Sequence, residues 1–397
     1  MSEITPLSVA KSSACAKAAY LLGKLGPLIG LIFVWGLFAA LKGEAFMTWG
    51  NQRLMLLQTA VVGTAALGAT LIIISGGIDL SVGSSIALGT VVIALLLKAG
   101  AAPAWAALGG IVAGLICGAT IGAIVIGHVG RVAAVILAVM TVVWTHGKWP
   151  IAGSLAAAAG VFAVLWVFNR FVLNRVPLAP FIVTLGMWGA LRGTAKGLGD
   201  NQLVYPDPDS LGWIGGLMSF TSRSPSHDVL GGETNGVLSN LIYALPPGVW
   251  VLIVLALLAA GLLRYTRFGR HVFAVGSNEQ TARLCGVHVE RTKLLVYMVG
   301  VGCAGVAALL QFANLTAGDP TTADGYELKV IAAVVIGGAS LAGGEGSILG
   351  TIVGALIMTV VDNGCAMLGL DNWVQEIVTG AIIVAAVILD RLRQRRG

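Results

Sequence analysis

The segment ISGGIDLSVGS (residues 74–84) places three glycines and one aspartate between two apolar stretches, at 54–75 and 81–97. Glycine is disfavoured inside a helix, so we expect the helix to break here. Burying a carboxylate in apolar surroundings costs free energy, so its presence indicates a structural or functional role. We expect Asp79 to cap Ser81 or the start of the next helix, where the helix dipole favours negative charge. Direct contact with a ligand hydroxyl is the alternative.

The composition around this segment is that of a membrane protein. Hydrophobic residues make up 57% of the chain and charged residues 11%, against about 25% charged in a soluble domain. Lipid cannot satisfy exposed peptide groups, so the spans should be helical, and 55 glycines allow close helix packing. We therefore expect an all-α polytopic protein with roughly ten to twelve spans, some too short to cross the membrane unbroken. The apolar stretches lie near 26–41, 54–75, 81–97, 104–126, 131–145, 151–168, 178–197, 247–263, 294–313, 328–341, 346–361 and 373–390.

Loop charge predicts the orientation of one transmembrane domain over residues 1–397. Lys and Arg in short loops resist translocation. They are concentrated in the tail 1–25, in 264–293 and in the C-terminal DRLRQRRG, so these parts and both termini should be cytoplasmic. The loop 198–246 has five acidic residues against one Arg and should lie outside. The net charge of +6 follows this distribution and does not indicate nucleic-acid binding.

The segment RYTRFGRHVFAVGSNEQTARLCGVHVERTK (264–293) is too long for a simple turn and contains six Arg or Lys. Within it, residues 278–286 have the pattern of a short helix. Such a helix in a basic cytoplasmic loop would be presented to a soluble partner protein.

A second glycine-rich segment, IGGASLAGGEGS (336–347), echoes residues 74–84 and contains Ser340. Two glycine-broken segments in corresponding halves are typical of transport proteins built from an internal repeat. A third segment, PFIVTLGMWGALRG (180–193), places Thr184 and Trp188 on one helix face, with Arg192-Gly193 expected to close the helix. That face either lines a polar pathway or packs against its neighbours. The hypothetical pathway residues are Asp79, Ser81, Thr184, Trp188 and Ser340.

Signals of catalysis are missing from the sequence. It has no phosphate-binding GxxxxGK[ST] loop, no HExxH and no GxSxG. The five cysteines have no CxxC spacing and the five histidines form no ligand cluster, so we expect no catalytic residue, cofactor or metal in this chain. If ATP drives its work, another chain hydrolyses it.

Four stretches together resemble the permease subunits of bacterial ABC importers for monosaccharides, the ribose/xylose/galactose type. They are SGGIDLSVGSS (75–85), PFIVTLGMWGALRG (180–193), residues 266–293, and GYELKVIAAVVIGGASLAGGEGSILGTIVGALI (325–357). The residues GVHVERTK (286–293) and the context of Asp362-Asn363-Gly364 look most like the xylose permease.

The resemblance implies two ATPase subunits on the cytoplasmic face and a periplasmic sugar-binding protein that delivers the substrate. It also implies a second permease copy, and a location in the bacterial inner membrane. The residues that fall on the family's ATPase-coupling segment are Asn278, Glu279, Ala282, Arg283 and Gly286.

Two departures from that family stand out. Residues 127–170 add an apolar pair, which we interpret as an inserted hydrophobic hairpin because the family usually has about ten spans. Gln280-Thr281 occupy positions where the family commonly has small residues.

Two other functions remain open. An ion-coupled secondary sugar transporter would need titrating groups inside the membrane, for which Asp79 is the strongest candidate. A membrane enzyme or scaffold would need converging polar side chains that the sequence does not reveal.

Overall fold

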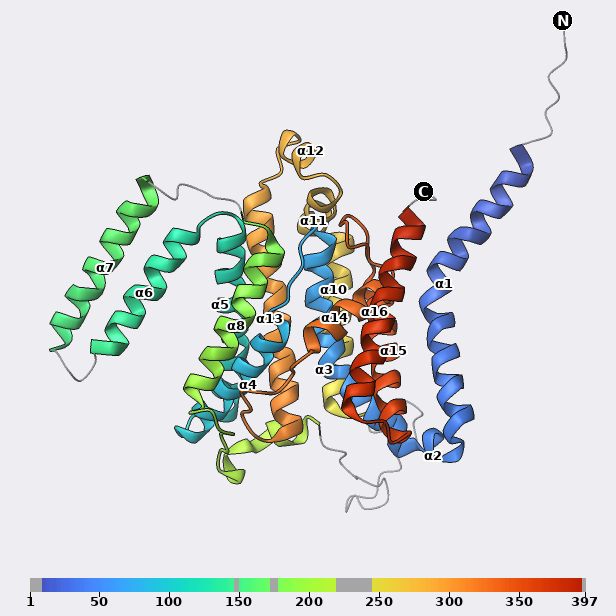
Figure 1. The fold of residues 1–397 in the computed structure, drawn as a ribbon, viewed down its shortest axis with the longest axis horizontal. Coiled ribbons are helices and arrows are strands. Elements are labelled where there is room, and N and C mark those ends of the chain that lie inside the picture. Colours follow the sequence, from blue (N-terminus) through green and yellow to red (C-terminus); the bar gives the residue numbers. More distant parts are fainter. Residues whose placement is uncertain (1–8, 146–149, 172–177, 219–244, 395–397) are drawn as a thin grey trace, which may run out of the picture.

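The computed structural model describes residues 9–145, 150–171, 178–218 and 245–394 (Figure 1). Its regular elements are all helices, joined by one isolated β-bridge between Val204 and Gly318. They are α1 (Val9–Lys42), α2 (Glu44–Met47), α3 (Trp49–Ile74), α4 (Val82–Lys98), α5 (Pro103–Val125), α6 (Val129–Thr145), α7 (Ile151–Phe171), α8 (Pro180–Leu198), the 3-10 helix η1 (Pro208–Gly216), α10 (Pro247–Tyr265), α11 (Arg267–Ser277), α12 (Glu279–Leu284), α13 (Val289–Leu315), α14 (Tyr326–Ile336), α15 (Ile348–Met367) and α16 (Asn372–Gln394).

The predicted all-α polytopic fold is confirmed. Five of the described helices are long and apolar enough to cross a membrane, namely α3, α5, α10, α13 and α15. Each of the predicted apolar stretches falls on a helix, but α14 has 11 residues. A helix of that length is about 17 Å long, too short for a hydrocarbon core of about 30 Å. The expectation that α8 closes at Arg192-Gly193 is wrong, because the helix continues to Leu198.

The bundle has two distinct ends (Figure 1). Helices α11 and α12 lie at one end, with the Val9 end of α1 and the Gln394 end of α16 on the same side. The opposite end carries η1 and α2. We call these the α12 end and the η1 end. Of the predicted tail 1–25, residues 9–25 belong to α1, while much of the predicted loop 198–246 lies outside the described residues.

The core forms around α3, whose most apolar window is 94% buried. Helices α5 and α13 cross at very short range because glycines line the contact. A Cβ on Gly114 of α5 would lie 2.8 Å from the Cα of Gly305 and 2.8 Å from the carbonyl oxygen of Val301, both on α13. Small residues that bring helix backbones together are the usual means of tight packing in membranes.

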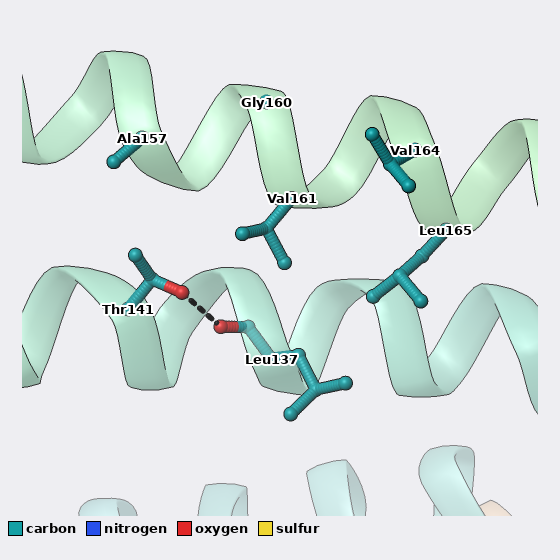
Figure 2. A pocket seen from close by; sticks show the side chains of 7 residues that line it. All are labelled: Leu137, Thr141, Ala157, Gly160, Val161, Val164 and Leu165. Carbon is teal, nitrogen blue, oxygen red and sulfur yellow. Dashed lines mark hydrogen bonds between the residues drawn. The ribbon is translucent and has the colours of Figure 1, made fainter.

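Helices α6 and α7, the expected hairpin of 127–170, pack on each other and stand away from the bundle (Figure 1). A groove of about 900 Å³ lies between them (Figure 2). The hydroxyl of Thr141 is turned back onto the helix, where it donates to Leu137 O at 2.7 Å, so the groove stays apolar. Its lining residues are Leu137, Thr141, Ala157, Gly160, Val161, Val164 and Leu165.

We expect Gly114→Ala to lower the stability of the bundle by about 1–3 kcal/mol, because the added methyl group meets backbone atoms that cannot move aside. The matched control is Gly186→Ala on α8, where a Cβ meets no atom within 4 Å. That change should raise stability by up to about 1 kcal/mol. Thermal unfolding of the purified variants in detergent compares them. Equal midpoints would contradict the packing described for α5 and α13.

Candidate functional site

Two stretches of non-helical backbone, each of which we call a break, interrupt the helices of the bundle. Residues 75–81 are non-helical between α3 and α4, and residues 316–325 are non-helical between α13 and α14. Non-helical backbone at membrane depth is tolerated only where protein or a cavity surrounds it. Consistent with this, Ser75, Asp79 and Ser81 in the first break are at most 4% exposed.

Both breaks contain the same aspartate-centred turn. Asp79 Oδ1 accepts hydrogen bonds from the backbone N of Ser81 at 2.8 Å and from its Oγ at 2.6 Å. Asp319 Oδ1 accepts from the N and the Oγ1 of Thr321, each at 2.7 Å. The predicted capping of Ser81 by Asp79 is confirmed. The structural counterpart of residues 75–81 is therefore 316–325, and not the echo at 336–347 that the sequence suggests.

Helix α8 fastens both breaks from one of its faces. Thr184 Oγ1 donates to Ile78 O in the first break at 3.2 Å, sharing its proton with Pro180 O of α8 at 3.1 Å. Two turns further along the helix, Arg192 Nη1 donates to Pro320 O at 3.1 Å and to Thr322 O at 2.6 Å in the second break. Side chains of α8 thus satisfy carbonyl groups that helix breaking has left without partners.

Trp188 lies between Thr184 and Arg192 along the same face, at the spacing that brings residues of successive turns together. Its Nε1 is buried and has no hydrogen-bond partner among the described residues. The face shared by Thr184 and Trp188 thus presents one buried donor that has no partner among the described residues.

The helices that resume after the breaks begin next to each other. Gly83, in the first turn of α4, has no side chain, and a Cβ there would lie 2.5 Å from Glu327 Oε2 in the first turn of α14. The breaks thus converge in the middle of the bundle. They do so from opposite ends, since α3 approaches from the η1 end and α13 from the α12 end (Figure 1).

The two glycine-rich motifs meet at the α12 end. Gly344 N donates to Ile74 O at 2.8 Å, and a Cβ on Gly343, which has φ +87°, would lie 2.9 Å from Gly76 Cα. Gly276 at the end of α11 enters the same contact, since its Cβ would lie 2.6 Å from Gly344 N. Ser340 is buried in this loop, and its Oγ accepts from Ala342 N at 3.2 Å. Backbone therefore connects α11 directly to the first break.

Helix α12 follows α11 and is built as a small rigid unit. Asn278 caps it by accepting from Thr281 N at 2.9 Å, and Gly286 ends it with φ +83°, which glycine adopts without strain. Ala282 is 4% exposed and packs with Val275 and Val289. Asn278 and Gly286 are thus exposed residues that shape the two ends of the helix, whereas Ala282 is turned inward.

The outer surface of α12 is charged, with one apolar exception. Glu279 forms ion pairs with Lys293 at 2.6 Å and with Arg283 at 3.5 Å. Leu284 is 89% exposed, which makes it the most exposed of the large hydrophobic side chains in the described part of the chain. Sequence reasoning missed Leu284, although its position two residues after the buried Ala282 predicts that it faces the other way.

A polar cavity of about 350 Å³ lies among α3, α13, α14, α15 and α16. Sequence reasoning did not identify this cavity, although amide side chains within the apolar spans were an available signal. None of the predicted pathway residues lines this cavity. Its polar lining includes Gln58, Gln311, Asn314, Lys329, Asp362 and Asn363.

Two side-chain interactions join the cavity wall to the second break. Lys329 Nζ of α14 contacts Asp362 Oδ2 of α15 at 2.7 Å, with both side chains about one quarter exposed. Gln311 Nε2 donates to Thr322 Oγ1 at 2.9 Å. A displacement of α14 or of the second break would therefore change the shape of the cavity.

The two breaks meet in the middle of the bundle next to a polar cavity, and the charged helix α12 lies at one end. This combination is typical of an integral-membrane transport protein. The comparison with known sequences agrees. Residues 122–387 match the family described as the permease component of the branched-chain amino acid transport system, and this chain belongs to that family.

Relatives extend over nearly the whole chain. It is 32% identical over 371 residues to the ribose import permease protein RbsC of Escherichia coli K12, which covers 92% of this chain and 93% of that protein. It is 30% identical over 414 residues to the xylose transport system permease protein XylH of Haemophilus influenzae, covering 93% and 96%. The resemblance noted in the sequence is thus confirmed. No solved structure matches the chain.

The Arg192 contacts generate a prediction. Arg192→Met should cost about 1.5–3 kcal/mol in unfolding free energy, because it removes charged hydrogen bonds to two buried carbonyl groups. The guanidinium also lies 3.7 Å from Asp324, whose side chain is 74% exposed. Exposed ion pairs contribute little, so Asp324→Asn should leave stability within about 0.5 kcal/mol of the parent. Chemical unfolding in detergent measures both. A larger loss in Asp324→Asn would show that the ion pair, and not the carbonyl contacts, holds the second break.

Proposed function

We propose that this chain is the membrane-spanning permease of an ABC importer that carries a monosaccharide inward by alternating access. A pentose of the ribose or xylose type is favoured, because relatives named for both sugars align over nearly its full length. ATP and magnesium would be bound by separate ATPase subunits. The proposal rests on α12, an exposed helix with a capped first turn. Through α11, which precedes it, this helix is joined to the first break by backbone contacts.

The proposed orientation puts the α12 end in the cytoplasm of a bacterial inner membrane. Arginine and lysine gather in 264–293, and the Val9 end of α1 and the Gln394 end of α16 lie on the same side of the bundle (Figure 1). Asp207 and Asp209, at the start of η1, lie at the opposite end. Lys and Arg favour the cytoplasmic side, which supports this assignment.

Energy would then enter through α12. An ATPase subunit that binds Leu284 and the Glu279–Arg283 surface would move α12 as a unit, since Ala282 packs it onto neighbouring residues. Gly276 passes that movement to Ile74 and Gly344 without an intervening side chain. The first break would follow, and α8 would couple it to the second.

Two further partners complete the proposed importer. A periplasmic sugar-binding protein would dock at the η1 end and deliver the substrate. A second copy of this chain would form the membrane dimer on which two ATPase subunits act.

The experiment that tests the function is reconstitution of this chain with its ATPase and binding protein in proteoliposomes. Uptake of radiolabelled xylose or ribose should require both ATP and the binding protein. Uptake that continues without ATP but collapses with a protonophore would establish an ion-coupled secondary transporter instead.

The α12 surface gives a sharper prediction. Leu284→Asp should reduce ATP-dependent uptake by at least about tenfold, since a charge replaces the apolar contact, while thermal stability stays unchanged. Leu284→Met keeps the apolar contact and should retain most of the activity. Co-purification of the ATPase with each variant measures the binding directly. Normal uptake by Leu284→Asp would exclude this surface as the site of coupling.

A further inference from the structure

We infer that the polar cavity among α3 and α13 to α16 is a binding site for one neutral monosaccharide on its way through the chain. The identity of the ligand rests on the proposed function. The site itself rests on the size, the lining and the unpaired polar groups of the cavity.

The size of the cavity suits a single sugar ring. The cavity volume of about 350 Å³ lies at the small end of the range for ligand pockets, roughly 300–1,000 Å³. The cavity is bordered by Met218, which follows η1, and by Gln375 of α16. It therefore lies toward the end of the bundle where the proposed binding protein would release its sugar.

The lining suits a polyhydroxylated molecule without charge. Amide side chains can donate to and accept from hydroxyl groups. Gln58, Gln311 and Asn314 supply amides, and Lys329 and Asp362 neutralise each other at 2.7 Å, so the site has no net charge to select an ion. Leu57, Val61 and Val62 provide an apolar wall for the carbon face of a ring.

One buried group in the lining lacks a partner. Asn363 is 6% exposed, and its Nδ2 donates to Asn51 Oδ1 at 2.9 Å. Among the described residues, however, its Oδ1 has no hydrogen-bond partner. A buried acceptor left in this state costs about 1–3 kcal/mol, so a rotation of the Asn363 side chain toward a sugar hydroxyl in the cavity would be favoured.

Binding would also affect the contacts that hold α14 and the second break in place. Tyr326 and Lys329 of α14 line the cavity, and α14 is held by the Lys329–Asp362 ion pair. Gln311, another lining residue, bonds Thr322 of the second break. A sugar hydroxyl that competes for these groups would loosen α14 from α15. The larger groove between α6 and α7 has no such lining, since Thr141 bonds its own helix (Figure 2).

A labelling experiment tests the site directly. The five natural cysteines are replaced by alanine in the full-length chain, and Asn314→Cys is introduced as a reporter in the cavity. In nanodiscs, millimolar xylose or ribose should slow maleimide labelling at this position by about tenfold, whereas sucrose should not. A reporter at Thr141, in the apolar groove, should be insensitive to either sugar. Equal labelling at 314 with and without pentose would overturn the inference.

A transport experiment supplies the second arm. In proteoliposomes with ATPase and binding protein, the double variant Gln58→Leu/Asn314→Leu should import sugar at least about tenfold more slowly at saturating binding protein. These side chains are exposed and make no hydrogen bonds within the described structure, so folding should be preserved. ATP hydrolysis stimulated by the binding protein should persist, and Thr141→Leu should transport like the parent. Normal import by the double variant would overturn the inference.

The two arms separate the proposals. Absence of ATP-dependent uptake by the parent chain, together with protection of the reporter by pentose, would remove the proposed function and leave the binding site. Normal uptake by the parent without protection would remove the binding site and leave the function.

Discussion

Peptide groups released where two helices break inside the bundle set the requirements for the rest of the structure. Lipid offers them no hydrogen-bond partner, so the protein must. Asp79 and Asp319 satisfy amides in the turns, and Thr184 and Arg192 of α8 satisfy carbonyls in both breaks. Hydrogen bonds from one face of α8 and from two aspartates therefore offset the backbone hydrogen bonds lost at the breaks. The breaks also create polar surface in the interior of the bundle, next to a cavity.

The same arrangement gives a short mechanical path through the molecule. Glycines bring α11, the end of α3 and the loop 337–347 into backbone contact. No flexible side chain stands between them to absorb a displacement. Packed interiors switch between arrangements more readily than they deform continuously, so a rigid movement of α12 would be passed on as a shift of the first break.

The sequence predicts the helical fold, most helix positions, the break at 75–81 and the short helix at 278–286, because hydropathy and glycine spacing are local signals. It fails where partners are distant in sequence. Residues 337–347 are non-helical as expected, but the turn that matches the one at Asp79 is built by Asp319 and lies outside this segment. Arg192 contacts residues 320 and 322, which are far from it in the sequence. Amides of α3 and α13 share one cavity. Both features depend on tertiary packing, for which the sequence has no local signal.

Helices α6 and α7 stand beside the core, and α6 connects the pair to the bundle by packing on α5. Bilayers of different thickness make embedded helices tilt to match them, at a small cost for each ångström of mismatch. Here that adjustment would be taken up by the pair, which can incline without disturbing the breaks or α8. Helices α6 and α7 would thus adapt to the thickness of the bilayer while the two breaks and α8 keep their geometry.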